Sequence, residues 1–242
     1  MTGVIPRQRA RRDTGEMRDP LAGSPWSAPG TVAGFAQSAP NERLMRFAQA
    51  ERHGAAARAL DLGCGAGRNA VPLAELGWDV LGIDLSWPML HAAAARALDE
   101  RVGRRVQFAL APMESLPVRD RSVDLVIAHG IWNLAASSAQ FRRAVREAAR
   151  VARPGAGLFL FTFSRRTLPP SARPVDGEPF VFTQFAGVPQ CFLTDRELVA
   201  EMAAAGFVPD PAVPLTEHNR PKSGALQTTT GPVIYEAAFR RR

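Results

Sequence analysis

The stretch Ala59 to Asn69, "ALDLGCGAGRN", places three alternating glycines directly after a short apolar run. Glycine loses more backbone freedom on folding than any other residue, so this usage indicates a tight turn or a ligand that closely approaches the main chain. Nucleotide-like ligands commonly bind at a glycine turn between a strand and a helix. The stretch therefore predicts a strand, a turn and a helix with a ligand at the end of the strand.

The rest of the chain alternates short apolar runs with helical patterns, which predicts an α/β fold. We expect a doubly wound, mostly parallel seven-stranded sheet with helices on both faces and a late antiparallel strand. The expected strands lie at about 58–62, 80–83, 106–110, 123–128 and 157–163 and in the final "GPVIYEAAF", and the expected helices at about 41–54, 69–76, 88–98, 141–152 and 194–206.

A chain of 242 residues has the length of one sizeable domain. Residues 1–33 mix Arg, Pro, Gly and Ser without periodicity, which predicts a poorly ordered basic arm, and residues 34–242 are expected to form a single domain. Residues 165–192 hold several prolines and the apolar segment "FVFTQF". We expect them to form an insertion that covers the substrate at the carboxyl edge of the sheet.

Composition excludes several classes of protein. The net charge of +7 is concentrated in "RQRARR" and "FRRR", without interleaved aromatic residues, so nucleic acid is a disfavoured partner. No apolar run reaches the ~18 to 20 residues of a membrane span, and no apolar segment of a secretory signal follows the N-terminal arginines, so a cytoplasmic location is expected. Cys64, Cys191 and the scattered histidines predict neither a disulfide framework nor a metal site. Monomer and homodimer both stay open.

The spacing of the glycines separates two kinds of ligand. A dinucleotide site requires Gly-x-Gly-x-x-Gly, but Arg68 occupies the place of its last glycine. Here Asp61 instead precedes the first glycine by two residues. A carboxylate at this distance would repel a pyrophosphate, but it can accept hydrogen bonds from an amino-acid ammonium group such as that of methionine.

From about Leu44 to Phe163 the sequence resembles the class I S-adenosylmethionine-dependent methyltransferases. The resemblance is carried by "LDLGCGAGRNAVPLAELGWDVLGIDLSWPML", in which Asp61 and the glycine turn match the methionine-binding motif. Asp84 matches the acid at the end of the second strand, whose carboxylate accepts from both ribose hydroxyls. The resemblance implies S-adenosyl-L-methionine as the cofactor. The expected cofactor-binding residues are Asp61, Gly63, Cys64, Gly65, Gly67, Asp84, Leu85, Met113, Glu114 and His129.

The stretch beside the adenine departs from the family pattern. In "LAPMESLPV" the usual acid is replaced by Pro112, which has neither a side-chain acceptor nor a backbone N–H. Met113 and Glu114 are the candidates for contact with the adenine, with ordinary loop residues as the alternative.

His129 follows the fourth expected strand and is the titratable residue suited to act as a general base on the acceptor, with an unperturbed pKa near 6.5. A role in contacting the cofactor or the loop is the alternative. The expected substrate-binding residues are Trp132, Asn133, Gln184 and Phe185, although Trp132 is equally consistent with core packing.

These observations predict methyl transfer from S-adenosylmethionine to a hydroxyl, thiol or nitrogen of a small molecule. Two alternatives stay open. The chain could bind the cofactor without catalysis, as a regulatory or assembly protein, which the replacement at Pro112 suggests. It could also methylate RNA, for which only the basic tails speak.

Overall fold

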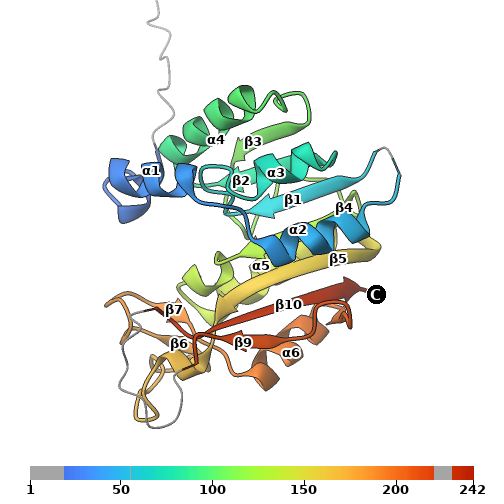
Figure 1. Cartoon of the computed structure of the whole chain (residues 1–242). Coiled ribbons are helices and arrows are strands. Elements are labelled where there is room, and N and C mark those ends of the chain that lie inside the picture. Colours follow the sequence, from blue (N-terminus) through green and yellow to red (C-terminus); the bar gives the residue numbers. More distant parts are fainter. Residues whose placement is uncertain (1–18, 55, 221–230) are drawn as a thin grey trace, which may run out of the picture.

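The computed structural model describes residues 19–54, 56–220 and 231–242 (Figure 1). Its helices are α1 (Pro29–Gln37), α2 (Glu42–Glu51), α3 (Ala70–Glu75), α4 (Trp87–Asp99), α5 (Ser138–Val151) and α6 (Asp195–Ala204), with short 3-10 turns at Pro25–Ser27, Trp132–Leu134 and Arg165–Thr167. Its strands are β1 (Arg58–Leu62), β2 (Asp79–Asp84), β3 (Val106–Leu110), β4 (Val123–His129), β5 (Ala152–Phe163), β6 (Val181–Phe182), β7 (Gln190–Cys191), β8 (Phe207–Pro209), β9 (Thr216–His218) and β10 (Ile234–Arg241).

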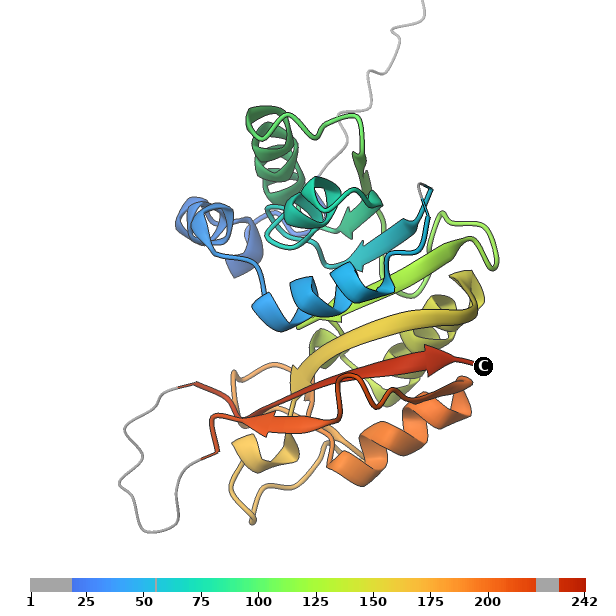
Figure 2. The same ribbon diagram turned by 45° about the vertical axis from the view of Figure 1, so that its right-hand side comes forward.

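One large sheet has the strand order β3-β2-β1-β4-β5-β10-β8, and β9 also pairs with β10. The pairs from β3 to β5 are parallel, whereas β10 is antiparallel to β5, β8 and β9. Figure 2 shows the long strand β10 alongside β5. The predicted α/β class, the parallel sheet and the late antiparallel strand are confirmed.

The predicted count of seven strands is wrong, because the described residues place eight in this sheet. Both β8 and β9 span three residues, too few to show an alternating apolar pattern. They pair with the edge of β10 that β5 leaves free, and an unpaired edge of that length would expose a row of backbone N–H and C=O groups.

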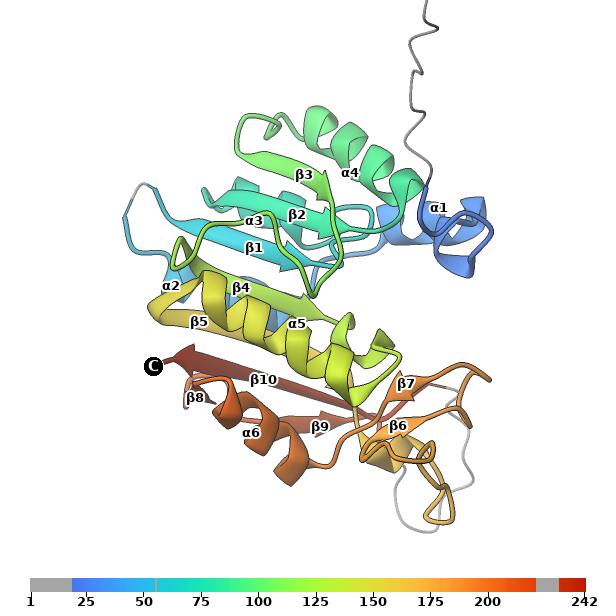
Figure 3. The same cartoon turned by 180° about the vertical axis from the view of Figure 1, so that it is seen from behind.

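Helices cover both faces of the sheet, as expected. Helices α2, α3 and α4 pack on one face, and α5 and α6 pack on the other (Figures 1 and 3). Successive residues of β1 and β4 pack into opposite cores. Ala59 and Leu125 lie in the core on the α2 side, and Leu60 and Val126 lie in the core on the α5 side. The central strands are apolar on both faces because both faces are covered.

The expectation of a poorly ordered arm over residues 1–33 is wrong for residues 19–33. They form the turn at Pro25–Ser27 and much of α1, which lies against α4. Asp19 Oδ1 accepts from the backbone N–H of Trp87 at 3.1 Å, and the Ser27 and Ser86 hydroxyls are 2.9 Å apart. Contacts to a distant helix order this segment, so its local pattern could not show it. Residues 1–18 lie outside the described residues.

Residues 165–192 follow the carboxyl end of β5, and Phe180, Val181 and Cys191 within them pack into the core on the α5 face. Strands β6 and β7 pair with each other and not with the large sheet (Figure 3). A small apolar cluster supports them, made of Leu168, Ala172, Phe182 and Phe192 with Phe163 at its edge. The predicted insertion therefore packs partly in this small cluster and partly in the main core, and its role as a cover for the substrate stays a prediction. Within the described ranges, no helix is long and apolar enough to cross a membrane.

Candidate active site at the carboxyl edge of the sheet

The glycine turn joins β1 to α3 with three residues in the left-handed region. The φ angles are +65° at Gly63, +53° at Gly65 and +76° at Gly67, where a residue with a Cβ would be strained. The N–H of Cys64 donates to Ile83 at 3.0 Å, which holds the turn against the end of β2. The turn therefore lies where two adjacent parallel strands end.

The three glycines differ in what a side chain would meet. A Cβ on Gly63 would lie 2.7 Å from Ile131, and one on Gly67 would lie 3.0 Å from Val71. A Cβ on Gly65 would have its nearest contact at 3.4 Å, on the ring of Phe35. Internal packing thus explains Gly63 and Gly67, whereas at the buried Gly65 a Cβ would make only ordinary van der Waals contacts with Phe35 and Met89, so its positive φ is what calls for glycine there.

Asp84 at the end of β2 is tied to the turn by its carboxylate. Its Oδ2 accepts from Gly65 N and its Oδ1 from Ser86 N, both at 2.9 Å. An ionised carboxylate has about four acceptor positions, so two stay free for vicinal hydroxyls. Burial raises the pKa of Asp84, and the half-buried Leu85 lies next to it in the chain. The geometry fits the expected role of Asp84 with a ribose.

Asp61 is 1% exposed, and its Oδ2 has no hydrogen-bond partner among the described residues. Burial, with the charge of Asp84 as a second cause, raises the pKa of Asp61 to about 8. A buried carboxylate without a partner is costly, and a cation beside it would stabilise its ionised form. This orphaned oxygen is what the ammonium group of a methionine-like ligand would satisfy, so the residues present fit S-adenosylmethionine.

Cys64 is buried in the core under α3 and α4, and burial raises the pKa of its thiol well above the usual value. Its position in the turn leaves the backbone as the part that can meet a cofactor. The second cysteine, Cys191, is also fully buried, and its Sγ lies 3.4 Å from the carbonyl oxygen of Ala135.

The loop after β3 lies beside Asp84, because Ala111 N donates to the Asp84 carbonyl oxygen at 3.2 Å. Met113 is partly buried against the core on the α5 face. Glu114 Oε1 accepts from Gln140 Nε2 at 2.9 Å, so its side chain is bound to the first turn of α5. Contact of either residue with adenine stays a prediction.

His129 is the last residue of β4 and has one aromatic neighbour, Phe161, and one polar neighbour, Asn41. Its ring stacks on Phe161 with centroids 4.3 Å apart, and its Nε2 is 3.2 Å from Asn41 Nδ2. Burial, with the positive charge of Arg68 as a second cause, lowers the pKa of His129 to about 4. This value lies well below the unperturbed 6.5, so the imidazole is neutral at pH 7.

The predicted substrate residues fall into two places. Trp132 is fully buried and packs edge-to-face on Phe141, with centroids 6.1 Å apart, so it is a core residue and not a wall of the site. Asn133 is 2% exposed, and its buried Oδ1 has no partner among the described residues. The short turn Trp132–Leu134 packs against α5, which buries the side chains of Trp132 and Asn133. The loop sequence alone does not show which of its side chains face inward.

Gln184 and Phe185 lie in the insertion. Gln184 Nε2 donates to the Arg173 carbonyl oxygen at 2.9 Å. Phe185 is 41% exposed, and its ring contacts Phe163 and Phe192 with centroids 5.5 and 5.7 Å apart. The structure thus places Phe185 in an aromatic cluster at the end of β5, and leaves Gln184 bound to its own loop.

Sequence reasoning missed four residues at this edge: Asn41, Asn69, Phe35 and Glu236. The sequence indicated Asn41 only as the start of a helix. In the structure it is the N-cap of α2, and its side chain accepts from Leu44 N. Glu236 carried a usable signal, because it is a lone acid within the apolar strand "VIYEAAF" and is 5% exposed.

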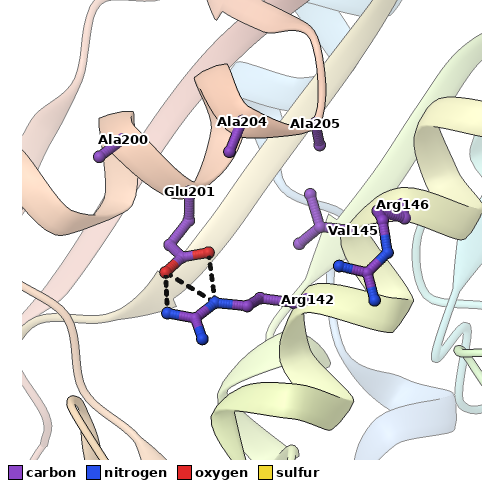
Figure 4. A pocket seen from close by; sticks show the side chains of 7 residues that line it. All are labelled: Arg142, Val145, Arg146, Ala200, Glu201, Ala204 and Ala205. Atoms are coloured by element: carbon purple, nitrogen blue, oxygen red, sulfur yellow. Dashed lines mark hydrogen bonds and ion pairs between the residues drawn. The ribbon is translucent and has the colours of Figure 1, made fainter.

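A cavity of about 300 Å³ lies between α5 and α6 and shares no residue with this site (Figure 4). Glu201 accepts from Arg142 Nε at 3.0 Å and from Arg142 Nη2 at 2.6 Å. The charges that line this cavity are largely paired with each other, so it offers no equivalent of the free Asp61 oxygen.

Trp132→Ala should lower the free energy of unfolding by about 3 to 5 kcal/mol, the usual cost of removing a large buried aromatic side chain. Urea denaturation measures this loss. Trp26→Ala is the matched control, because Trp26 is 39% exposed and should cost far less. Equal losses in the two variants would contradict the assignment of Trp132 to the core.

Comparison with known proteins agrees with this geometry. A family model described as "Methyltransferase domain" matches residues 60–160. The ubiquinone biosynthesis O-methyltransferase of Azorhizobium caulinodans is 31% identical over 153 residues, which cover 62% of this chain and 58% of that protein. The chain therefore matches less than two thirds of the length of this curated relative.

Two solved structures share the fold. The Burkholderia thailandensis 1,6-didemethyltoxoflavin-N1-methyltransferase, with bound 1,6-didemethyltoxoflavin and S-adenosylhomocysteine, is 25% identical with a TM-score of 0.59, over 83% of this chain and 79% of that one. The cyclase SpnF is 19% identical with a TM-score of 0.63, over 92% of this chain and 91% of that one. The matched domain, the glycine turn with its two acids and the shared fold lead to one conclusion: residues 60–160 match a methyltransferase domain, and this chain is similar to the class I S-adenosylmethionine-dependent methyltransferases.

Proposed function

We propose that this protein transfers a methyl group from S-adenosylmethionine to a small-molecule acceptor. The observation that carries the proposal is the buried, unpartnered Oδ2 of Asp61, which is close enough to the carboxylate of Asp84 for the two charges to interact, with Asp84 itself bound to Gly65 N. The cyclase SpnF has the same fold, so the fold alone does not specify the reaction, and the site must.

Asp61 would hold the ammonium group, the backbone at Gly65 would lie against the methionine part, and Asp84 would accept from the ribose hydroxyls. The bound cofactor supplies a methyl group that is already activated on a sulfonium. The protein then has to align the acceptor and exclude water. Phe35 of α1, which lies over the Cα of Gly65, is placed to help exclude water from the turn.

The acceptor should have a flat apolar body. Phe161 of β5 stacks on His129. Phe163 lies on the same face of β5, about 7 Å further along the strand. It packs with Phe185 and Phe192. Such a cluster favours aromatic ligands through stacking and apolar contact. The relatives named above are an O-methyltransferase and an N-methyltransferase, so an oxygen and a nitrogen acceptor both fit. A cytoplasmic location, nucleic acid as a disfavoured partner, and a monomer or homodimer stay predictions from the sequence.

The first test compares two acids of one strand. Asp84→Asn should weaken the binding of S-adenosylmethionine by about 2 to 4 kcal/mol, because charge-assisted hydrogen bonds to the ribose are lost. Asp79→Asn, at the exposed start of β2, should leave binding unchanged. Calorimetry measures the affinity of each variant for S-adenosylmethionine, with NAD as a second ligand for comparison. An affinity loss below tenfold for Asp84→Asn would contradict the proposed ribose contact.

Turnover is then measured as S-adenosylhomocysteine formed with a panel of phenols, thiols and nitrogen heterocycles. We expect product with at least one flat aromatic acceptor and none with RNA. Tight cofactor binding without turnover across the panel would instead support the regulatory alternative.

His129→Gln should leave cofactor affinity within about threefold and lower turnover by ~10² if His129 is the base. The acid limb of the wild-type rate that reports His129 should then lie near pH 4, where its folded-state pKa lies.

Gly65→Ala and Gly63→Ala separate ligand approach from internal packing. Both positions have positive φ, so each variant carries a similar backbone strain of about 1 to 2 kcal/mol. Gly65→Ala should lose no more stability than this backbone strain accounts for. It should also lose cofactor affinity, because its Cβ would enter the space proposed for the ligand. Gly63→Ala should melt much lower, since its Cβ would meet Ile131. Unchanged affinity in a folded Gly65→Ala protein would refute the proposed approach.

The pH dependence of stability tests Asp61. The pKa of Asp61 is about 8 in the folded protein and about 3.9 when unfolded, so its contribution to folding is fully present below pH 4 and is lost as pH rises to 8. Asp61→Asn should therefore be more stable than wild type at pH 8, and should lose the cofactor. In wild type, the rise in melting temperature on adding S-adenosylmethionine should be larger at pH 8 than at pH 6. The same pH trend in Asp61→Asn would contradict the pairing of Asp61 with the ammonium.

A further inference from the structure

Three side chains form a row across adjacent strands on the face that α2 covers. His129 of β4 is in register with Phe161 of β5, and Phe161 is in register with Glu236 of β10. Side chains of residues directly opposite each other point to the same face. Asn41, the N-cap of α2, lies over this row: its Nδ2 is 2.6 Å from Glu236 Oε1 and 3.2 Å from His129 Nε2.

The orientation of the Asn41 amide follows from its other contacts. Its Oδ1 accepts from Leu44 N at 2.8 Å, as an N-cap does, so the opposite end of the amide must be the NH₂ group. The Asn41 backbone N–H in turn donates to Asn69 Oδ1 at 3.1 Å. The two amide hydrogens are thus directed at Glu236 and at His129.

A donor facing His129 Nε2 determines which imidazole nitrogen carries the proton. Nε2 must present its lone pair to the Asn41 NH₂, so the ring proton lies on Nδ1. Protonation of Nε2 would set two donors against each other at 3.2 Å. The charge of Arg68 and the burial of the ring act in the same direction.

Glu236 holds the amide in place, and its own charge is balanced. It is 5% exposed, and its Oε2 lies 3.4 Å from Arg43 Nη1 of α2 and 3.5 Å from His218 Nε2 of β9. The charged and titratable groups around His129 are therefore Arg68 from the glycine turn and, behind Asn41, Glu236 with Arg43 and His218. The described contacts of His129 include no direct contact with a carboxylate that would favour its cationic form.

We propose that Asn41 and Glu236 are positioning residues that hold His129 as the neutral Nδ1–H tautomer with Nε2 as the acceptor. For its role in catalysis the proposal rests on the proposed methyl transfer. A neutral imidazole avoids a second positive charge at the edge that would receive the sulfonium.

The decisive variant is Asn41→Ser. Serine keeps the cap on Leu44 N but removes the NH₂ group, so α2 should stay intact while His129 loses its donor. Nitrogen-15 NMR of the imidazole rings reads the tautomer and the titration without cofactor or turnover. The chain has four histidines, and His129→Gln assigns the signal. Wild type should show the Nδ1–H pattern and stay neutral to below pH 5.

In Asn41→Ser the Nδ1–H preference should be lost, and the midpoint of the His129 titration should rise by about one pH unit, the size expected for one hydrogen bond. Asn41→Asp retains the cap and places a carboxylate at Nε2, so it should raise the midpoint further. Glu236→Gln keeps an oxygen that accepts from the Asn41 amide but removes a negative charge, so it should leave the Nδ1–H preference in place and should not raise the midpoint. Thr194→Ser is the matched control, since it exchanges the cap of α6 far from His129 and should change nothing.

An unchanged tautomer and midpoint in both Asn41 variants would overturn the proposal, whatever the enzyme assays show. If the spectra change as expected while no acceptor is methylated, the positioning holds and the proposed function fails. If activity is present, Asn41→Ser should move the acid limb of the rate profile by the same amount as the titration midpoint. An acid limb that stays in place would show that His129 does not act on the acceptor.

Discussion

The hydrogen bond from Gly65 N to Asp84 Oδ2 is the contact on which the site depends. It joins the turn after β1 to the end of β2, so two strands and the helices that follow them meet at one point. Gly65 is buried and has positive φ, with the side chains of Phe35 and Met89 lying over its Cα. The turn and the carboxylate of Asp84 are thereby held at one place.

Electrostatics divide this edge into two parts. Asp61 is an acid whose buried oxygen lacks a partner, and a cation would relieve that cost. His129 is a base that burial and a facing amide donor keep uncharged. The edge therefore favours the positive charge of a ligand next to Asp61 and avoids placing another on the protein beside the acceptor. The fold of the parallel strands supplies both positions, since β1 and β4 are adjacent and end together.

The cofactor side was more predictable than the acceptor side. The glycine turn, Asp61 and Asp84 lie in one stretch of sequence, and their spacing reflects backbone geometry that local sequence specifies. Trp132 shows the opposite case: it follows the strand that carries His129, yet it turns into the core against Phe141. The direction of a loop side chain depends on the helix that packs over it, which no local pattern reports.

The sequence by itself determined the alternation of strands and helices, the glycine turn and the positions of Asp61 and Asp84 at the ends of their strands, because each rests on contacts between near neighbours in the chain. Tertiary structure alone decided the rest. It ordered residues 19–33 against α4, added β8 and β9 to the edge of β10, and lowered the pKa of His129. It also brought Asn41 and Glu236, 195 positions apart, into contact with each other, and Asn41 into contact with the imidazole of His129. Burial and hydrogen bonding between distant segments are properties of the packed chain, so they become visible only when the strands have been placed side by side.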